Sequence, residues 1–156
     1  MKQPDFDVAA AHRYFGPYCF NACWDLIEKS NRTVDDDRMM VALSQASLFH
    51  WRNRPDVTDK NLAIGYWQVS RVYALVGAAQ EAKRYAELGL SLSGEAAPFH
   101  KAYAHEAMAR AARGLGDVSL AASHLAQAWA LVAAVKTEDD RKLLTTDLEG
   151  LGPRPA

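Results

Sequence analysis

The sequence lacks most of the features that would assign it to a specialised class of protein. Its 156 residues include only two cysteines, and 18 basic residues nearly balance 19 acidic ones, which leaves a formal net charge of −1. A charge this small provides no field to attract nucleic acid or an anionic membrane. No apolar run approaches the ~18 residues of a membrane-spanning helix, and the N-terminus is polar and acidic rather than signal-like. We therefore expect a cytoplasmic protein that binds neither nucleic acid nor membrane.

The sequence also lacks the motifs of common enzymes. It contains no Gly-x-Ser-x-Gly elbow, no phosphate-binding glycine loop and no dinucleotide fingerprint. None of the five histidines has the spacing of a zinc or di-iron site; they are His12, His50, His100, His105 and His124. We therefore predict no catalytic residue, no metal ligand and no cofactor. The alternative is a small helical metal-binding protein or enzyme that uses His12, His50 or His105 with a carboxylate such as Glu106.

The two cysteines occupy one face of a predicted helix. Cys19 and Cys23 are four residues apart, and side chains on adjacent turns of a helix point in nearly parallel directions, which is poor geometry for a disulfide. Free cysteine is among the most buried residue types. We predict two buried, unpaired thiols.

Apolar residues recur at intervals of three and four along nearly the whole chain, and no segment alternates with period two. This periodicity predicts an all-α protein, and the length is that of a single domain. We divide that domain, residues 1–149, into a degenerate hairpin (8–54), two further hairpins (58–93 and 98–134) and a capping helix (137–149), followed by a flexible tail (150–156).

Helix boundaries carry recognisable signals. Thr33, Thr58, Asp117 and Thr137 stand where an N-cap is expected, and the acidic run 35–37 falls in a first turn, where the helix dipole favours negative charge. Gly16-Pro17 lies inside the first helix, predicted from residue 8 to 29, and should kink or interrupt it because proline cannot donate a backbone hydrogen bond.

The two central hairpins resemble each other. Their turn glycines, Gly77 and Gly116, lie 39 positions apart, and small residues follow each glycine at equal offsets. The matching positions are Tyr66, Val69, Tyr73, Gly77, Ala82, Ala86 and Gly89 in the first hairpin and His105, Met108, Ala112, Gly116, Ala121, Leu125 and Ala128 in the second. Small residues let the second helix of each hairpin approach its neighbours closely, and glycine tolerates the left-handed conformation of the turn.

This pattern resembles the tetratricopeptide repeat (TPR), a helix-turn-helix unit of about 34 residues. The characteristic tryptophan and glycine of the first helix are replaced here, by Tyr66 and Ser70 and then by His105 and Ala109. The resemblance implies hairpins stacked as a short right-handed superhelix. The alternative architecture is a closed helical bundle.

In the repeat family, the first helix of each unit lines a concave groove. The groove positions carried over to this sequence are Trp67, Arg71, Tyr103, Glu106, Arg110 and Arg113. Aromatic rings and arginines dominate protein interfaces, and a guanidinium group can donate two parallel hydrogen bonds to a carboxylate. The expected function is a non-catalytic interaction module that binds a peptide segment of a partner protein. A solvated face on which Glu106 pairs with Arg110 is the alternative for these residues.

Self-association is a further alternative. A short helical array leaves an apolar edge on its first or last hairpin, and a homodimer can cover that edge.

Overall fold

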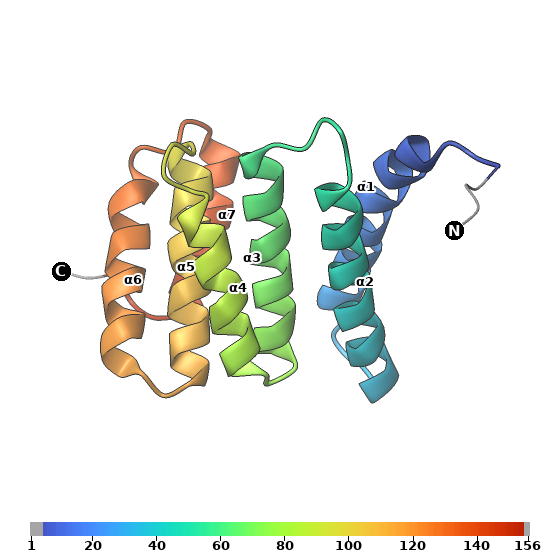
Figure 1. Cartoon of the computed structure of the whole chain (residues 1–156). Coiled ribbons are helices and arrows are strands. Elements are labelled where there is room, and N and C mark those ends of the chain that lie inside the picture. The colour runs from blue at the N-terminus through green and yellow to red at the C-terminus, as the bar shows by residue number, and fades with distance from the viewer. Residues whose placement is uncertain (1–4, 155–156) are drawn as a thin grey trace.

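A computed structural model of the chain describes residues 5–154, which form seven α-helices joined by short loops (Figure 1). The helices are α1 (Val8–Ile27), α2 (Val34–Arg52), α3 (Asp59–Leu75), α4 (Ala79–Ser91), α5 (Pro98–Gly114), α6 (Val118–Val132) and α7 (Glu138–Glu149). The described residues contain no strand, which confirms the all-α class. No helix among them is long and apolar enough to cross a membrane. The start of the predicted domain (1–4) and the end of the predicted tail (155–156) lie outside the described residues.

The first six helices form three hairpins that lie side by side in chain order (Figure 1). α1 packs against α2, α3 against α4, and α5 against α6, while α2 meets α3 and α4 meets α5 between hairpins. The first and third hairpins therefore stand at opposite ends of a row. The last helix, α7, packs back against α5 and α6.

The four predicted N-cap residues all cap their helices. Thr33 and Thr58 each close a capping box, and the side chains of Asp117 and Thr137 accept a backbone hydrogen bond in the first turn of α6 and α7. The acidic run 35–37 occupies the first turn of α2. These caps satisfy backbone N–H groups that the helices leave unpaired at their first turns.

Gly77 and Gly116 form the turns of the two central hairpins. Gly77 and Gly116 have φ angles of 81° and 73°, in the left-handed region that glycine adopts without the steric cost of a side chain. The backbone N–H groups that follow them bond back to the first helix of their hairpin, from Ala78 to the Tyr73 carbonyl and from Asp117 to the Ala112 carbonyl. The chain thus reverses direction at the predicted positions.

The first helix is not broken at Gly16-Pro17, where the sequence predicts a kink or an interruption. α1 continues through Pro17, and the carbonyl of Gly16 accepts a hydrogen bond of 2.9 Å from the hydroxyl of Ser47 on α2. A Cβ atom at Gly16 would lie 3.4 Å from the ring of Trp51. That distance is an ordinary van der Waals contact, and the Ser47 side chain bonds the α1 backbone just before the proline.

Both cysteines are free and buried, as predicted. Cys23 lies against Met40 and Val72 in the core between α1, α2 and α3. Burial, together with the neighbouring Cys19, raises the pKa of Cys23 to about 12. Its thiol therefore stays protonated at neutral pH and is unreactive.

Small residues set the spacing of the second helix in each central hairpin. Ala82 and Ala86 on α4, and Ala121 and Ala128 on α6, are all buried. The hydroxyl of Ser70 on α3 donates a hydrogen bond of 2.8 Å to the carbonyl of Ala82, so the two backbones lie close together. Alanine leaves the room that this approach requires.

Ala121→Leu should therefore overpack the contact between α5 and α6. We expect it to lower the free energy of unfolding by about 1–3 kcal/mol, measured by urea denaturation. Ala122→Leu is the matched control, because Ala122 is the next residue of the same helix and is exposed; its effect should stay within about 0.5 kcal/mol. Equal stability of the two variants would contradict the close packing at Ala121.

Candidate functional site

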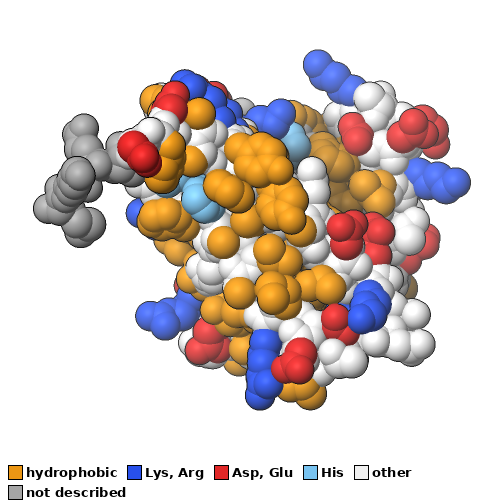
Figure 2. Space-filling view, turned by 90° about the vertical axis from the view of Figure 1, so that its right-hand side faces the viewer, with side chains coloured by type: hydrophobic (Ala, Val, Ile, Leu, Met, Phe, Trp, Pro, Cys, Tyr) orange, Lys and Arg blue, Asp and Glu red, His pale blue; other side chains and the backbone are white. Residues whose placement is uncertain are grey.

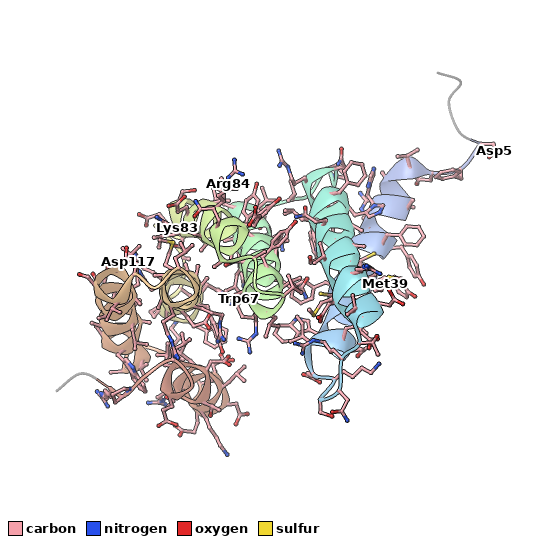
Figure 3. All side chains as sticks on the ribbon, turned by 90° about the horizontal axis from the view of Figure 1, so that it is seen from below. Asp5, Met39, Trp67, Lys83, Arg84 and Asp117 are labelled. Atoms are coloured by element: carbon pink, nitrogen blue, oxygen red, sulfur yellow. The ribbon has the colours of Figure 1, made fainter. Side chains whose placement is uncertain are left out.

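A cleft of about 660 Å³ opens where α1, α3, α5 and α7 meet. Much of its wall is aromatic and is supplied by Phe20, Trp24, Trp67, Phe99 and Tyr103. Arg71 and Asp147 add opposite charges to the lining. Figure 3 shows that Trp67 extends from one side of the α3–α4 hairpin, whereas Lys83 and Arg84 project from the opposite side.

The aromatic side chains form one continuous wall. The Trp24 and Trp67 ring centroids are 5.6 Å apart, and Trp67 meets Tyr103 edge to face at 5.1 Å. Phe99 extends the wall with its centroid 5.0 Å from that of Tyr103. The rings come from three different helices, so the wall exists only when all three hairpins are stacked.

Arg71 places a positive charge in this aromatic surrounding. Its Cζ atom lies 5.7 Å from the ring centroid of Trp24 and 5.8 Å from that of Trp67. Nη2 donates to Oδ1 of Asp147 at 3.2 Å, and Nη1 lies 3.8 Å from Oε1 of Glu106. Among the described residues, Nε and Nη1 of Arg71 are buried with no hydrogen-bond acceptor. Two of the donor atoms of Arg71 are thus left without a hydrogen bond within residues 5–154.

Glu106 sits at the centre of the polar contacts around the cleft. Its side chain is fully buried, and its Oε2 accepts a hydrogen bond of 3.1 Å from the indole Nε1 of Trp67. Nε of Arg110 donates to Oε1 at 2.7 Å, and Nη2 of Arg110 contacts the same oxygen. The alternative pairing of Glu106 with Arg110 is therefore present, but in the interior rather than on a solvated face.

The last helix contributes a side chain that the sequence analysis did not place at the site. Asp147 on α7 accepts from Arg71 and, at 2.9 Å, from the hydroxyl of Tyr103. Burial and the adjacent Asp147 carboxylate raise the pKa of Tyr103 well above its ordinary value. Asp147 follows the buried Leu144 by three residues and therefore lies on the same side of α7. That spacing is the only signal in the sequence that could have indicated it.

The six predicted groove residues divide into three groups. Trp67, Arg71 and Tyr103 line the cleft, whereas Glu106 and Arg110 lie behind it and hold it in place. Arg113 lies elsewhere and donates through Nη1 to the carbonyls of Leu151, at 2.5 Å, and Gly150, at 3.3 Å. It therefore satisfies the carboxyl-terminal end of α7 and fastens the start of the predicted tail. Phe20, Trp24, Phe99 and Asp147 also line the cleft and are not among the six predicted residues.

Four of the five histidines form two pairs on separate hairpins, and the fifth, His100, lines the cleft. Nδ1 of His12 lies 2.9 Å from Nδ1 of His50, and Nδ1 of His105 lies 3.0 Å from Nδ1 of His124. Burial, together with His124, lowers the pKa of His105 to about 4. Glu106, the carboxylate of the metal-site alternative, contacts arginine and tryptophan. Within residues 5–154, no three histidine, cysteine or acidic side chains converge in the manner of a metal site.

The chain was also compared with known proteins. No protein-family model, curated protein or solved structure matches it. The chemistry of the site therefore has to be derived from its own residues.

Removing the charge of Glu106 should destabilise the fold. Glu106→Gln leaves the partly buried Arg71 and Arg110 without a shared carboxylate, and we expect a loss of about 3 kcal/mol in the free energy of unfolding. Glu87→Gln is the control, because Glu87 is exposed and its contact with Lys83 lies on the surface; it should cost less than about 1 kcal/mol. Similar urea midpoints for the two variants would show that Glu106 does not connect the helices.

The buried hydroxyl of Tyr103 should make stability fall at alkaline pH. The unfolded chain loses this proton near its ordinary pKa of about 10, whereas the folded chain retains it, so the unfolded state binds fewer protons. The contribution of Tyr103 is thus complete below pH 10 and declines above it, by up to about 1.4 kcal/mol per pH unit. Urea denaturation of wild type and Tyr103→Phe at pH 8 and pH 11 measures this. A stability difference that is equal at both pH values would contradict it.

Proposed function

We propose that this chain is a non-catalytic interaction module that holds a peptide segment of a partner protein in the cleft between α1, α3, α5 and α7. We also propose that its hairpins form a TPR-like superhelix with this cleft on the concave side. The support for the superhelix is the row of antiparallel hairpins with its two left-handed turn glycines. The free, buried thiols are consistent with a cytoplasmic location.

The main support for the proposal is that two N–H groups of Arg71 have no hydrogen-bond acceptor in the described part of the chain. A guanidinium group beside two neighbouring indole rings has two buried N–H groups that no described residue accepts. A buried donor without a partner costs about 1–3 kcal/mol, and an incoming carboxylate would remove that cost. The ligand should therefore present an acidic side chain or a free carboxyl terminus to Arg71.

The remainder of the cleft favours an apolar side chain beside that carboxylate. Trp24, Trp67, Phe99 and Tyr103 offer rings that lose water on binding, and aromatic anchors contribute most of the energy of typical interfaces. The ionisable side chains of the lining are Glu28, Arg71, His100, Tyr103 and Asp147, and the other lining residues are apolar. This largely apolar composition supports binding. We expect micromolar affinity, about −8 kcal/mol, for a short segment in an open cleft.

A displayed library of random peptides tests the function, because it requires no knowledge of the natural partner. Selected peptides should share an apolar residue near an acidic residue or a carboxyl terminus. Calorimetry then compares Leu143→Glu with Leu88→Glu. Both leucines are exposed, but Leu143 lines the cleft and Leu88 lines a different hollow between α2, α3 and α4. We expect Leu143→Glu to weaken binding at least about tenfold and Leu88→Glu to leave it unchanged.

A second experiment tests whether Arg71 binds the carboxylate of the peptide. Wild type should prefer a peptide with the carboxylate over the same peptide with an amide by about tenfold, and Arg71→Gln should lose that preference. Arg84→Gln, on the opposite side of the hairpin (Figure 3), should retain it. Failure to select any peptide, or selected peptides that bind Leu143→Glu and wild type equally, would overturn the cleft as the binding site.

A further inference from the structure

The hairpin at the amino-terminal end of the row exposes a connected group of aromatic side chains. Tyr14, Phe15 and Tyr18 on α1 and Phe49 on α2 are 61%, 41%, 53% and 59% exposed. The Tyr14 ring centroid lies 5.1 Å from that of Phe15 and 5.7 Å from that of Tyr18. The imidazole of His50 bridges the helices, 5.4 Å from both Phe15 and Phe49. We refer to Tyr14, Phe15, Tyr18 and Phe49 as the aromatic end face.

Figure 2 looks directly at this end of the molecule and shows hydrophobic side chains gathered into a broad area. α7 lies on one side of the row, next to α5 and α6 (Figure 3), where Leu144 and Leu148 are fully buried. No described helix packs over the aromatic end face, which is open to solvent.

The size of this surface fits a protein interface. At roughly 200 Å² for each aromatic side chain, the exposed parts of the four rings amount to about 400 Å². Apolar patches of about 300–600 Å² are the largest that monomers usually expose, and they often mark interaction sites. Each partner in an interface of standard size buries about 800 Å², so the four rings would supply about half of that area.

The chemistry of the surface favours a second copy of the chain over a charged partner. None of the four side chains carries a charge at neutral pH, so a strongly acidic or basic surface would gain no ion pair on them. The chain has a net charge of only −1, so two copies do not repel each other strongly. Aromatic rings pair well with aromatic rings, in stacked or edge-to-face geometry.

The arrangement of the rings also suits two-fold symmetry. Tyr14 and Tyr18 are stacked one helical turn apart on α1, with 15° between their planes. A two-fold axis between them would bring Tyr14 of one copy against Tyr18 of the other, twice over. A symmetric interface of this kind closes on itself and stops at two copies. We propose that the aromatic end face is a self-association surface through which two copies of this chain form a symmetric dimer.

Sedimentation velocity across the micromolar range tests the dimer. Wild type should shift from monomer to dimer, and the double variant Tyr14→Gln/Tyr18→Gln should raise the dissociation constant at least about tenfold. The matched control is Leu115→Gln/Val118→Gln, which removes two exposed hydrophobic side chains from the third hairpin, at the other end of the row, and should dimerise like wild type. Far-ultraviolet circular dichroism and thermal melts establish that both variants are folded.

Hydroxyl-radical footprinting gives a second readout that identifies the face directly. Tyr14, Tyr18 and Phe49 should be oxidised less as the protein concentration rises through the dissociation constant, whereas the exposed Leu115 should be oxidised equally throughout. A wild-type chain that stays monomeric across the range would overturn the proposal. Growth into oligomers without a limit, or a tyrosine variant that dimerises like wild type, would also overturn it.

Discussion

The cleft depends on the buried carboxylate of Glu106. It accepts hydrogen bonds from Trp67 on α3 and from Arg110 on its own helix, and it lies 3.8 Å from Arg71. A carboxylate removed from water is stable only when its oxygens are hydrogen-bonded and its charge is balanced. Glu106 meets both conditions only when α3 and α5 lie in the observed register. The same contact therefore fixes the packing between hairpins and the position of a tryptophan in the cleft.

The last helix, α7, adds a second carboxylate, Asp147, to the contacts around Arg71. Leu144 and Leu148 bury α7 among Tyr103, Trp129 and Val132, which brings Asp147 to the edge of the cleft. Arg71 and Arg110 are thus matched by two carboxylates, Glu106 and Asp147, so the network is neutral as a whole. Neutrality does not satisfy every donor, however. Nε and Nη1 of Arg71 still have no hydrogen-bond acceptor among the described residues.

The elements of this fold could be predicted from the sequence because their signals are local. Capping residues such as Thr33, and the turn glycines Gly77 and Gly116, act within a few residues of their position. The pairing of Glu106 with Arg110 is also local, since one helical turn separates them. Asp147 could not be found in this way, because 76 residues separate it from Arg71. Periodicity shows which side of α7 is apolar, but not which helices that side meets.

Some of the predicted groove residues line the cleft, whereas others lie behind it. The distinction between local and distant contacts also explains this division. Helical spacing places Tyr103, Glu106 and Arg110 on one side of α5, and in an isolated helix all three would be exposed. Stacking against α3 buries Glu106 completely and turns Arg110 toward it, while Tyr103 remains at the cleft. Each role is therefore set by what the neighbouring hairpin covers. An extended ligand would meet the rings and Arg71 first, and the buried carboxylate would act on it only by holding these groups in place.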